Sequence, residues 1–335
     1  MFSLIIALWI LNSSRNETAL IYKNGIIQGV VSVDPYQYGW TILEETFCSV
    51  LHPNLTIIII IHSASDHFKQ RVLLRQMYGE RFYKQYGIAT LFAVGLAKDS
   101  KMQGQLIEES RRERDLIQQN FLDSYRNLTW KVELPYASAM MWLRFVDEYC
   151  PNVQYIMKLD DDVVGNILQV LRFLNERVEA VNLLESQKRI FCRVIYNRPV
   201  SREKTNKWYV TKDELPSEYY SNYCVGMAIV FTGDLPRILL RAAAAERYFW
   251  IDDYFVTGIL AKKAEAHLVD LKRKIVVYGW EGSEEGLVNG DIFFRLIPDM
   301  SYGIQLWRQI ELRHSMRSSD RPTQLAILPW HHRTK

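Results

Sequence analysis

Residues 55–61 constrain the fold most, because they form an almost unbroken apolar run that is rich in isoleucine. Such a run is typical of a central strand buried on both faces, as in a parallel sheet. Helix-like and strand-like patterns alternate after it, and Asp66 can cap a helix that runs to about Tyr78. Further strands are expected near residues 91–94, 153–159, 190–195 and 227–231, and further helices near residues 106–120, 137–149, 235–247 and 253–264.

The alternation predicts an α/β fold with a mainly parallel sheet that is flanked by helices on both faces. The 335 residues suffice for one large domain or two smaller ones. In such sheets, ligands bind beyond the carboxyl ends of the strands. The net charge is only +3 and the basic residues are dispersed, so nucleic acid is not an expected partner.

The first 11 residues are apolar except for Ser3, and none of their side chains is charged. A membrane-spanning helix needs roughly 20 apolar residues, so this run is a short signal anchor, a signal-peptide core or the remnant of a longer anchor. Asn-x-Ser/Thr sequons begin at Asn12, Asn16, Asn54 and Asn127, and two of them follow the run closely, as in a lumenal stem. We expect an anchor and stem in residues 1–50, a catalytic domain in residues 51–315 and a C-terminal tail in residues 316–335.

The four cysteines are Cys48, Cys150, Cys192 and Cys224, and they contain no CxxC pair. This spacing argues against a zinc site. In a lumenal protein the cysteines could form two disulfides in any of three connectivities, and the alternative is buried free thiols.

Three consecutive carboxylates, Asp160, Asp161 and Asp162, follow the strand expected at residues 153–159. Like charges placed this close repel one another, and a divalent cation would relieve the repulsion while also holding a substrate diphosphate. The alternative is an acidic turn that leads into a helix near Asn166. Lys158 should lie on the same face as Asp160, where it could pair with Asp160 or lie near the donor.

A second acidic group, the pair Asp252 and Asp253, stands at the start of the helix expected at residues 253–264. One member could be a general base, because a neighbouring carboxylate raises its pKa. The alternative is simple stabilisation of the helix N-terminus. Arg71 and Arg75 lie about one helical turn apart and could both meet a phosphate, or form a surface pair on an amphipathic helix.

Several segments resemble motifs of glycosyltransferase family 31, the β-1,3-galactosyltransferases and β-1,3-N-acetylglucosaminyltransferases, and occur in the same order as in that family. The resemblance is greatest to the invertebrate members of the family. The resemblance runs from about Ile57 to Leu260. Met77 and Tyr78 stand where the family has Thr-Trp. The matching segments are residues 71–79 (R-x-x-x-R-x-x-x-G), Glu109-Ser110 with Asp115, residues 121–131, residues 158–163 with Asn166, residues 207–210 (K-W-Y-V), residues 223–226 (Y-C-x-G), and Asp252-Asp253 with Thr257-Gly258.

The resemblance implies a GT-A-type, Rossmann-like fold and an inverting transfer from a UDP-sugar with Mn²⁺. It implies that Asp162 ligates the metal, that Asp253 is the base and that Asp252 is its supporting neighbour. The residues assigned to donor binding are Arg71, Arg75, Asp115, Lys158, Asp160, Asp161 and Trp208. His267 and His314 are candidates for a further metal ligand.

The function expected is therefore transfer of galactose or an N-acetylhexosamine to a glycan of a glycoprotein or glycolipid, in β-1,3 linkage. The resemblance also implies a Golgi membrane protein of type II topology with a lumenal catalytic domain. One alternative is a catalytically weak family member that binds UDP-sugars or glycans, motivated by the change at Met77-Tyr78 and the short N-terminal run. Another is a metal-dependent nucleotidyl- or phosphotransferase that uses the aspartates differently.

Overall fold

The computed structural model describes residues 22–23, 26–27, 39–79, 83–120, 138–180 and 187–318. The N-terminal apolar run, the sequons at Asn12, Asn16 and Asn127, and the family-like segment 121–131 lie outside the described residues. Asn54 is described and its side chain is exposed. Among the described helices, none is both long and apolar enough to cross a membrane.

The strand expected from the isoleucine run is β4 (Ile57–Ser63), and all five isoleucines are fully buried. Because side chains alternate along a strand, Ile58 and Ile60 enter one hydrophobic core while Ile57, Ile59 and Ile61 enter another. The sheet therefore separates two cores. The expectation of a strand buried on both faces is confirmed.

β4 lies near the middle of an eight-stranded sheet, and the order of its strands is β13-β9-β12-β7-β4-β5-β6-β3. β12 runs antiparallel to both of its neighbours and β3 runs antiparallel to β6, whereas all other neighbours are parallel. The sheet is thus mainly parallel, as expected. The other strands are β3 (Trp40–Ile42), β5 (Ile88–Val94), β6 (Leu116–Gln119), β7 (Tyr155–Asp160), β9 (Arg189–Cys192), β12 (Ala228–Thr232) and β13 (His267–Asp270).

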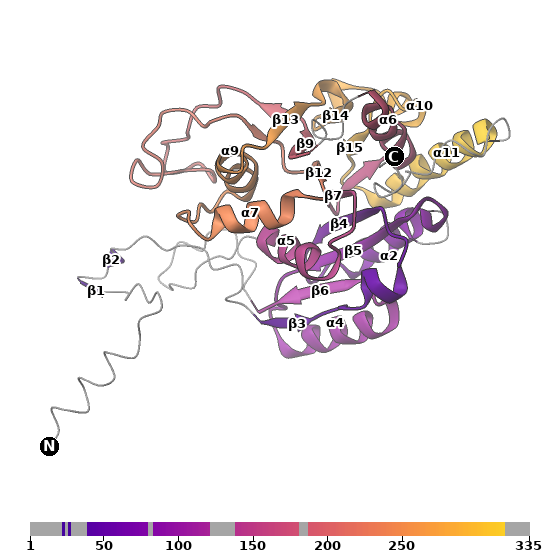
Figure 1. Cartoon of the computed structure of the whole chain (residues 1–335), viewed down its shortest axis with the longest axis horizontal. Coiled ribbons are helices and arrows are strands. Elements are labelled where there is room, and N and C mark those ends of the chain that lie inside the picture. The colour runs from indigo at the N-terminus through magenta and orange to yellow at the C-terminus, as the bar shows by residue number, and fades with distance from the viewer. Residues whose placement is uncertain are drawn as a thin grey trace, which may run out of the picture.

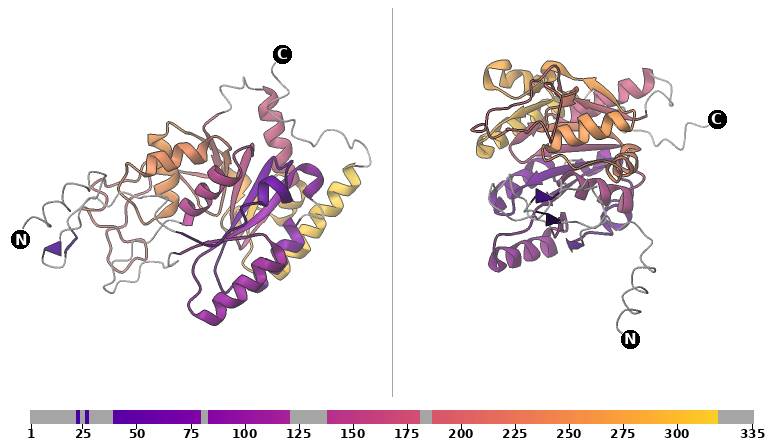
Figure 2. Two further views of the ribbon diagram at one scale, coloured as in Figure 1. Left: turned by 60° about the horizontal axis from the view of Figure 1, so that its bottom comes forward. Right: turned by 90° about the vertical axis from the view of Figure 1, so that its left-hand side faces the viewer.

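Helices cover both faces of this sheet (Figure 1). The helices that pack on one face are α2 (Phe68–Tyr78), α4 (Ser100–Glu113), α6 (Ile167–Ala180), α10 (Glu284–Asn289) and α11 (Met300–Ser318). Those on the other face are α5 (Ser138–Tyr149), α7 (Leu235–Ala243) and a continuous helical segment made of α8 (Asp252–Tyr254), the π-helix η4 (Phe255–Leu260) and α9 (Ala261–Lys263). The right-hand view of Figure 2 shows the earlier elements, in indigo and magenta, below the later ones, in orange and yellow.

Smaller elements complete the fold. A second sheet pairs β14 (Ile275–Val276), β15 (Phe294–Leu296) and β8 (Val163–Gly165). The two-stranded sheets are β1 (Tyr22–Lys23) with β2 (Ile26–Ile27), and β10 (Val194–Ile195) with β11 (Tyr223–Cys224). The short helices are η1 (Phe47–Leu51), η2 (Lys84–Tyr86), η5 (Lys272–Lys274) and η6 (Gly279–Glu281).

All four cysteines are paired. Cys48 is bonded to Cys150, and Cys192 is bonded to Cys224. The alternative of buried free thiols is therefore wrong. The folded region also begins before residue 51, because β3 pairs with β6 and Cys48 is bonded to Cys150, which directly follows α5.

Two details differ from the sequence-based expectations. The helix expected at residues 106–120 ends at Glu113, because Arg114 adopts a left-handed conformation with φ of 54° and the chain then enters β6. Asp66 does not cap α2; His67 occupies the N-cap position, and its side chain makes no capping hydrogen bond.

Arg71 and Arg75 of α2 form ion pairs with two acidic residues, Glu109 of α4 and Asp115. Arg71 is fully buried, and its Nε and Nη2 donate to the two carboxylate oxygens of Glu109 at 3.0 and 2.8 Å. Arg75 also pairs with Glu109, and its Nε and Nη2 donate to Asp115 at 2.7 and 2.8 Å. Burial alone would raise the pKa of Glu109, but the two arginines hold that pKa below its ordinary value.

The alternative of a surface pair is therefore wrong for Arg71. All three guanidinium nitrogens of Arg71 donate within the protein, to Glu109, Ser63 and the carbonyls of residues 64 and 65. A contact between either arginine, or Asp115, and a bound donor stays a prediction.

Replacing one acid of this cluster tests its contribution to stability. Glu109→Gln leaves the Arg71 charge buried without its carboxylate, so we expect the free energy of unfolding to fall by about 3–5 kcal/mol. Urea unfolding followed by tryptophan fluorescence measures it. The matched control is Glu113→Gln, which removes the partner of the exposed Arg112 and should cost about 1 kcal/mol or less. Equal effects of the two changes would contradict a structural role for the buried pair.

Candidate active site

The aspartate triplet lies at the junction of the two sheets. Asp160 ends β7 of the large sheet, and β8 of the small sheet begins at Val163. The backbone amide of Ile297 donates to the carbonyl of Asp162 at 2.7 Å, which fixes the turn. The triplet therefore follows the carboxyl end of a central strand, where ligands bind in folds of this class.

Tyr78 supports the segment that follows the triplet. Its hydroxyl donates to the carbonyl of Val163 at 3.2 Å and accepts from the amide of Gly165 at 2.7 Å. Tyr78 and the adjacent Met77 are both fully buried. The change from the family's Thr-Trp at these positions is thus accommodated in the core, where Tyr78 makes specific contacts with β8.

Lys158 joins the triplet to a second segment of the chain. The buried Lys158 Nζ donates to Asp160 Oδ1 at 2.5 Å and to the carbonyl of Gly226 at 2.7 Å. Burial lowers the pKa of Lys158, but the charges of Asp160 and Asp253 outweigh that effect and raise the pKa. Lys158 is therefore held as an ammonium ion between the two acidic segments. Of the two roles considered for it, pairing with Asp160 is the one that the structure shows.

Asp253 packs directly against the backbone of Gly226. Burial raises the pKa of Asp253 to about 6; the charge of Lys158 and a hydrogen bond from the Gly226 amide oppose this rise, and the charge of Asp160 adds to it. A Cβ atom at residue 226 would overlap the Asp253 carboxylate, so only glycine permits this approach. The site thus contains a carboxylate whose pKa is suited to accepting a proton near neutral pH.

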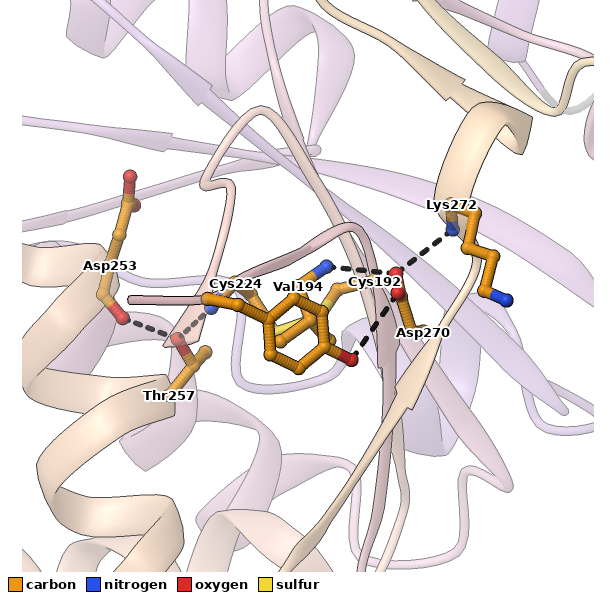
Figure 3. Close-up of a disulfide and its surroundings, with 8 residues drawn as sticks. Cys192, Val194, Cys224, Asp253, Thr257, Asp270 and Lys272 are labelled. Carbon is orange, nitrogen blue, oxygen red and sulfur yellow. Dashed lines mark hydrogen bonds between the residues drawn. A yellow bond between two sulfur atoms is a disulfide. The ribbon is translucent and has the colours of Figure 1, made fainter. Parts of the chain in front are cut away.

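The helix that carries Asp253 is bound to β11 (Figure 3). The Thr257 hydroxyl donates to the carbonyl of Asp253 at 2.5 Å and accepts from the amide of Cys224 at 2.9 Å. The Cys192–Cys224 disulfide then joins β11 to the end of β9. Asp252 lies beside Asp253 in the first turn of α8 and is partly exposed.

Asp161 has a partner that the sequence reasoning missed. His67 Nδ1 lies 2.7 Å from Asp161 Oδ2, and the His67 side chain is 40% exposed. His67 comes at the start of α2, 94 residues before its partner. The sequence indicated a role for His67 only weakly, through its position just before a helix.

Asp162 fits the role of a cation ligand. Its Oδ1 is buried and has no hydrogen-bond partner among the described residues. Burial raises the pKa of Asp162, and the charges of Asp160 and Asp161 raise it further. No three His, Cys, Asp or Glu side chains in the described ranges form a complete metal site. A cation held by one or two carboxylates and substrate phosphates does not need one.

The two histidine candidates are placed differently. His314 is buried, and its Nε2 lies 2.9 Å from Asn166 Oδ1. His267 is exposed on β13, the edge strand that β9 and β12 separate from β7. His267 is therefore not brought to the triplet.

Trp208 lies next to the segment that carries the acidic pair. Its ring stacks on that of Trp250, with centroids 5.9 Å apart and planes inclined by 13°. Lys207 Nζ lies 4.7 Å from the centroid of the Trp208 ring. Donor binding by Trp208 stays a prediction.

The chain matches known proteins over the region that contains this site. A family model described as Galactosyltransferase matches residues 69–272. Human β-1,3-galactosyltransferase 1 is 27% identical over 236 residues, which are 70% of this chain and 68% of the relative. Human β-1,3-galactosyltransferase 2 is 29% identical over 255 residues, which are 75% of this chain and 57% of the relative.

Solved structures resemble the chain more weakly. The galactosyltransferase LgtC, solved with donor and acceptor sugar analogs, overlaps 82% of this chain and 98% of its own. The identity is 9% and the TM-score is 0.37, which is too low to support an argument about function.

The family match contains Lys158, the triplet and the acidic pair. The chain is therefore a glycosyltransferase, and it belongs to the galactosyltransferase family. Its mixed sheet with helices on both faces is the α/β fold of GT-A type expected from the sequence. Such enzymes take a sugar from a nucleotide-sugar donor and transfer it to a glycan acceptor.

The contact between Gly226 and Asp253 leads to a direct test. Gly226→Ala must displace the Asp253 carboxylate, and a shift of about 1 Å in a reacting group can lower the rate about 100-fold. We expect a loss of kcat of this size in a sugar-transfer assay. Gly104→Ala is the control, because a Cβ there meets nothing within 4 Å. Circular dichroism should show both variants folded, and equal activity of the two would contradict the importance of this contact.

Proposed function

We propose that the protein is an inverting hexosyltransferase that moves galactose or an N-acetylhexosamine from a UDP-sugar to a glycan hydroxyl. The new bond is a β-1,3 linkage. The names of the human relatives, both β-1,3-galactosyltransferases, support the linkage and the galactosyl group. The acceptor is a glycan of a glycoprotein or glycolipid.

The observation that carries this proposal is the contact of Lys158 and Gly226 with both acidic segments. Lys158 binds Asp160 and the Gly226 carbonyl, and the Gly226 amide donates to Asp253. This arrangement supports one site in which the triplet serves the donor and Asp253 serves the acceptor. An isolated acidic turn or a simple helix cap requires no such connection.

In this mechanism Asp253 takes the proton of the acceptor hydroxyl. The acceptor oxygen forms a bond to the anomeric carbon from the face opposite UDP, while the bond from that carbon to the diphosphate breaks and its electron pair leaves with UDP. One base and correct positioning suffice, and the configuration at the anomeric carbon inverts. Asp252 supports the base, and Lys158 compensates the acids around it.

Asp160 and Asp161 are assigned to the ribose and sugar of the donor, with His67 orienting Asp161. Asp162 would ligate a Mn²⁺ ion, and its buried oxygen without a partner supports that role. When bound, the cation would neutralise negative charge on the departing UDP.

We also propose that the enzyme acts in the Golgi lumen and that an N-terminal anchor holds it to the membrane. The pairing of all four cysteines supports an oxidising compartment, where disulfides persist. The apolar N-terminal run and the nearby sequons support the same route.

Two substitutions separate the roles of the acidic segments. Asp162→Asn should weaken Mn²⁺-dependent binding of UDP-sugars. Asp253→Asn should leave donor binding near normal and lower transfer by about 100-fold or more, since it removes a general base. Calorimetry with UDP and Mn²⁺ measures binding, and UDP release from a panel of UDP-sugars with simple glycan acceptors measures transfer.

Near-normal turnover by Asp253→Asn would show that another group is the base. Tight UDP binding without release from any donor would favour the catalytically weak family member. Turnover of a nucleoside triphosphate would favour the nucleotidyl- or phosphotransferase.

The pH dependence of transfer should report Asp253. Its pKa is raised to about 6, so the ionised base is lost as pH falls through about 6, rather than near 4. We expect kcat/KM to be constant above this value and to fall about tenfold per pH unit below it.

Lys158→Met should move this fall to higher pH, because the Lys158 charge lowers the pKa of Asp253. Lys158→Arg keeps the charge and is the control. An unchanged profile in Lys158→Met would show that the observed pKa belongs to another group.

A further inference from the structure

Tyr278 and Trp280 form an exposed aromatic pair that the mechanism above does not use. Trp280 is 84% exposed, more than any other large hydrophobic side chain that the structure describes, and Tyr278 is 57% exposed. Their rings are nearly parallel, with centroids 5.9 Å apart and planes inclined by 5°. Single exposed apolar residues are common on proteins, but here the stacking of the two rings holds each ring in a fixed orientation at the surface.

The backbone that carries this pair is held firmly. Arg193 donates through Nη1 and Nη2 to the two carboxylate oxygens of Glu281, each at 2.6 Å. Glu281 Oε2 also accepts from the amides of Val277 and Tyr278, at 3.1 Å each. The hydrogen bonds from Arg193 lower the pKa of Glu281 to about 2. Glu281 is therefore ionised at any physiological pH.

A second arginine holds the same turn from the other side. Arg295 is buried, and its guanidinium donates to the carbonyls of Gly279 and Gly282. Two arginines thus fix a segment whose aromatic side chains are directed into solvent. A surface ordered in advance loses less conformational entropy when a ligand binds.

The turn is also linked to both parts of the site. The carbonyl of Arg193 accepts from the amide of Val225 at 2.9 Å, and Val225 precedes Gly226, which contacts Asp253. On the other side, Arg295 lies on β15, which pairs with β8 directly after Asp162. The aromatic pair is therefore attached to the backbone that positions the acceptor base and the triplet.

We propose that Tyr278 and Trp280 form a subsite that stacks on a pyranose ring of the acceptor glycan, beyond the sugar that receives the transferred group. The face of an aromatic ring carries negative potential, and the C–H groups on one face of a pyranose present a flat, weakly positive surface to it. The subsite rests on the proposed function, because it needs a glycan acceptor that reaches Asp253. It explains why a rigid turn presents aromatic rings to water.

The test compares Trp280→Ala with Trp280→Phe, which keeps a ring, and with the control Leu312→Ala, which removes an exposed apolar side chain on α11. The acceptors are the monosaccharides methyl β-galactoside and methyl β-N-acetylglucosaminide and the disaccharide N-acetyllactosamine, in which N-acetylglucosamine lies beyond a terminal galactose. Trp280→Ala should raise the KM for N-acetyllactosamine about tenfold, the value of one aromatic stacking contact, and leave kcat within about twofold. The KM for the monosaccharides should change little. Trp280→Phe should recover most of the loss, and Leu312→Ala should behave as the wild type.

Direct binding separates this proposal from the proposed function. Saturation-transfer NMR with N-acetyllactosamine should show contact in the wild type and a loss in Trp280→Ala, whether or not any UDP-sugar is turned over. An unchanged acceptor KM together with unchanged NMR contact in Trp280→Ala would overturn the subsite. Two other results for Trp280→Ala would also overturn the subsite if glycan binding stays intact. Loss of self-association would assign the aromatic pair to contact with a second copy of the chain, and loss of binding to phosphatidylcholine vesicles would assign it to a lipid surface.

Discussion

The site depends on the interactions of one buried ammonium group, that of Lys158. Lys158 lies near the carboxyl end of β7, a central strand of the sheet, where Asp160 and Asp253 would otherwise repel each other. Burying a charge is costly unless it is compensated, and here the lysine and the acids compensate one another. Because the same ammonium binds the carbonyl of Gly226, one side chain sets both the charge balance of the site and the distance between its two acidic segments.

Much of the fold follows from local sequence pattern. The isoleucine run of β4 and the helices α2, α5 and α7 were expected near their observed places, since buried strands and amphipathic helices have strong periodic signals. The end of α4 was not predicted. Charged residues continue the helical pattern there, and only the left-handed conformation of Arg114 and the pairing of β6 with β3 and β5 end it.

The site was predicted in part. The triplet and the acidic pair stand out as adjacent acids, so their residue types could be identified without a structure. The contacts between segments far apart in sequence could not. His67 reaches Asp161 over 94 residues, and Glu109 neutralises Arg71 over 38 residues. The contact of Gly226 with Asp253 depends on the packing of α8 against β11, which no local pattern encodes.

The Cys192–Cys224 disulfide has a consequence for where the chain can become competent. Cys224 lies two residues before Gly226, and its amide binds the threonine that holds the backbone of Asp253. This disulfide, which persists only in an oxidising environment, is thus part of the support of Asp253, the proposed proton acceptor. A copy that folded in a reducing compartment would retain the hydrophobic strands of its sheet but lose the covalent bond that supports the proposed base. If the enzyme acts in the Golgi lumen, as proposed, this disulfide would couple sugar transfer to passage through the secretory route.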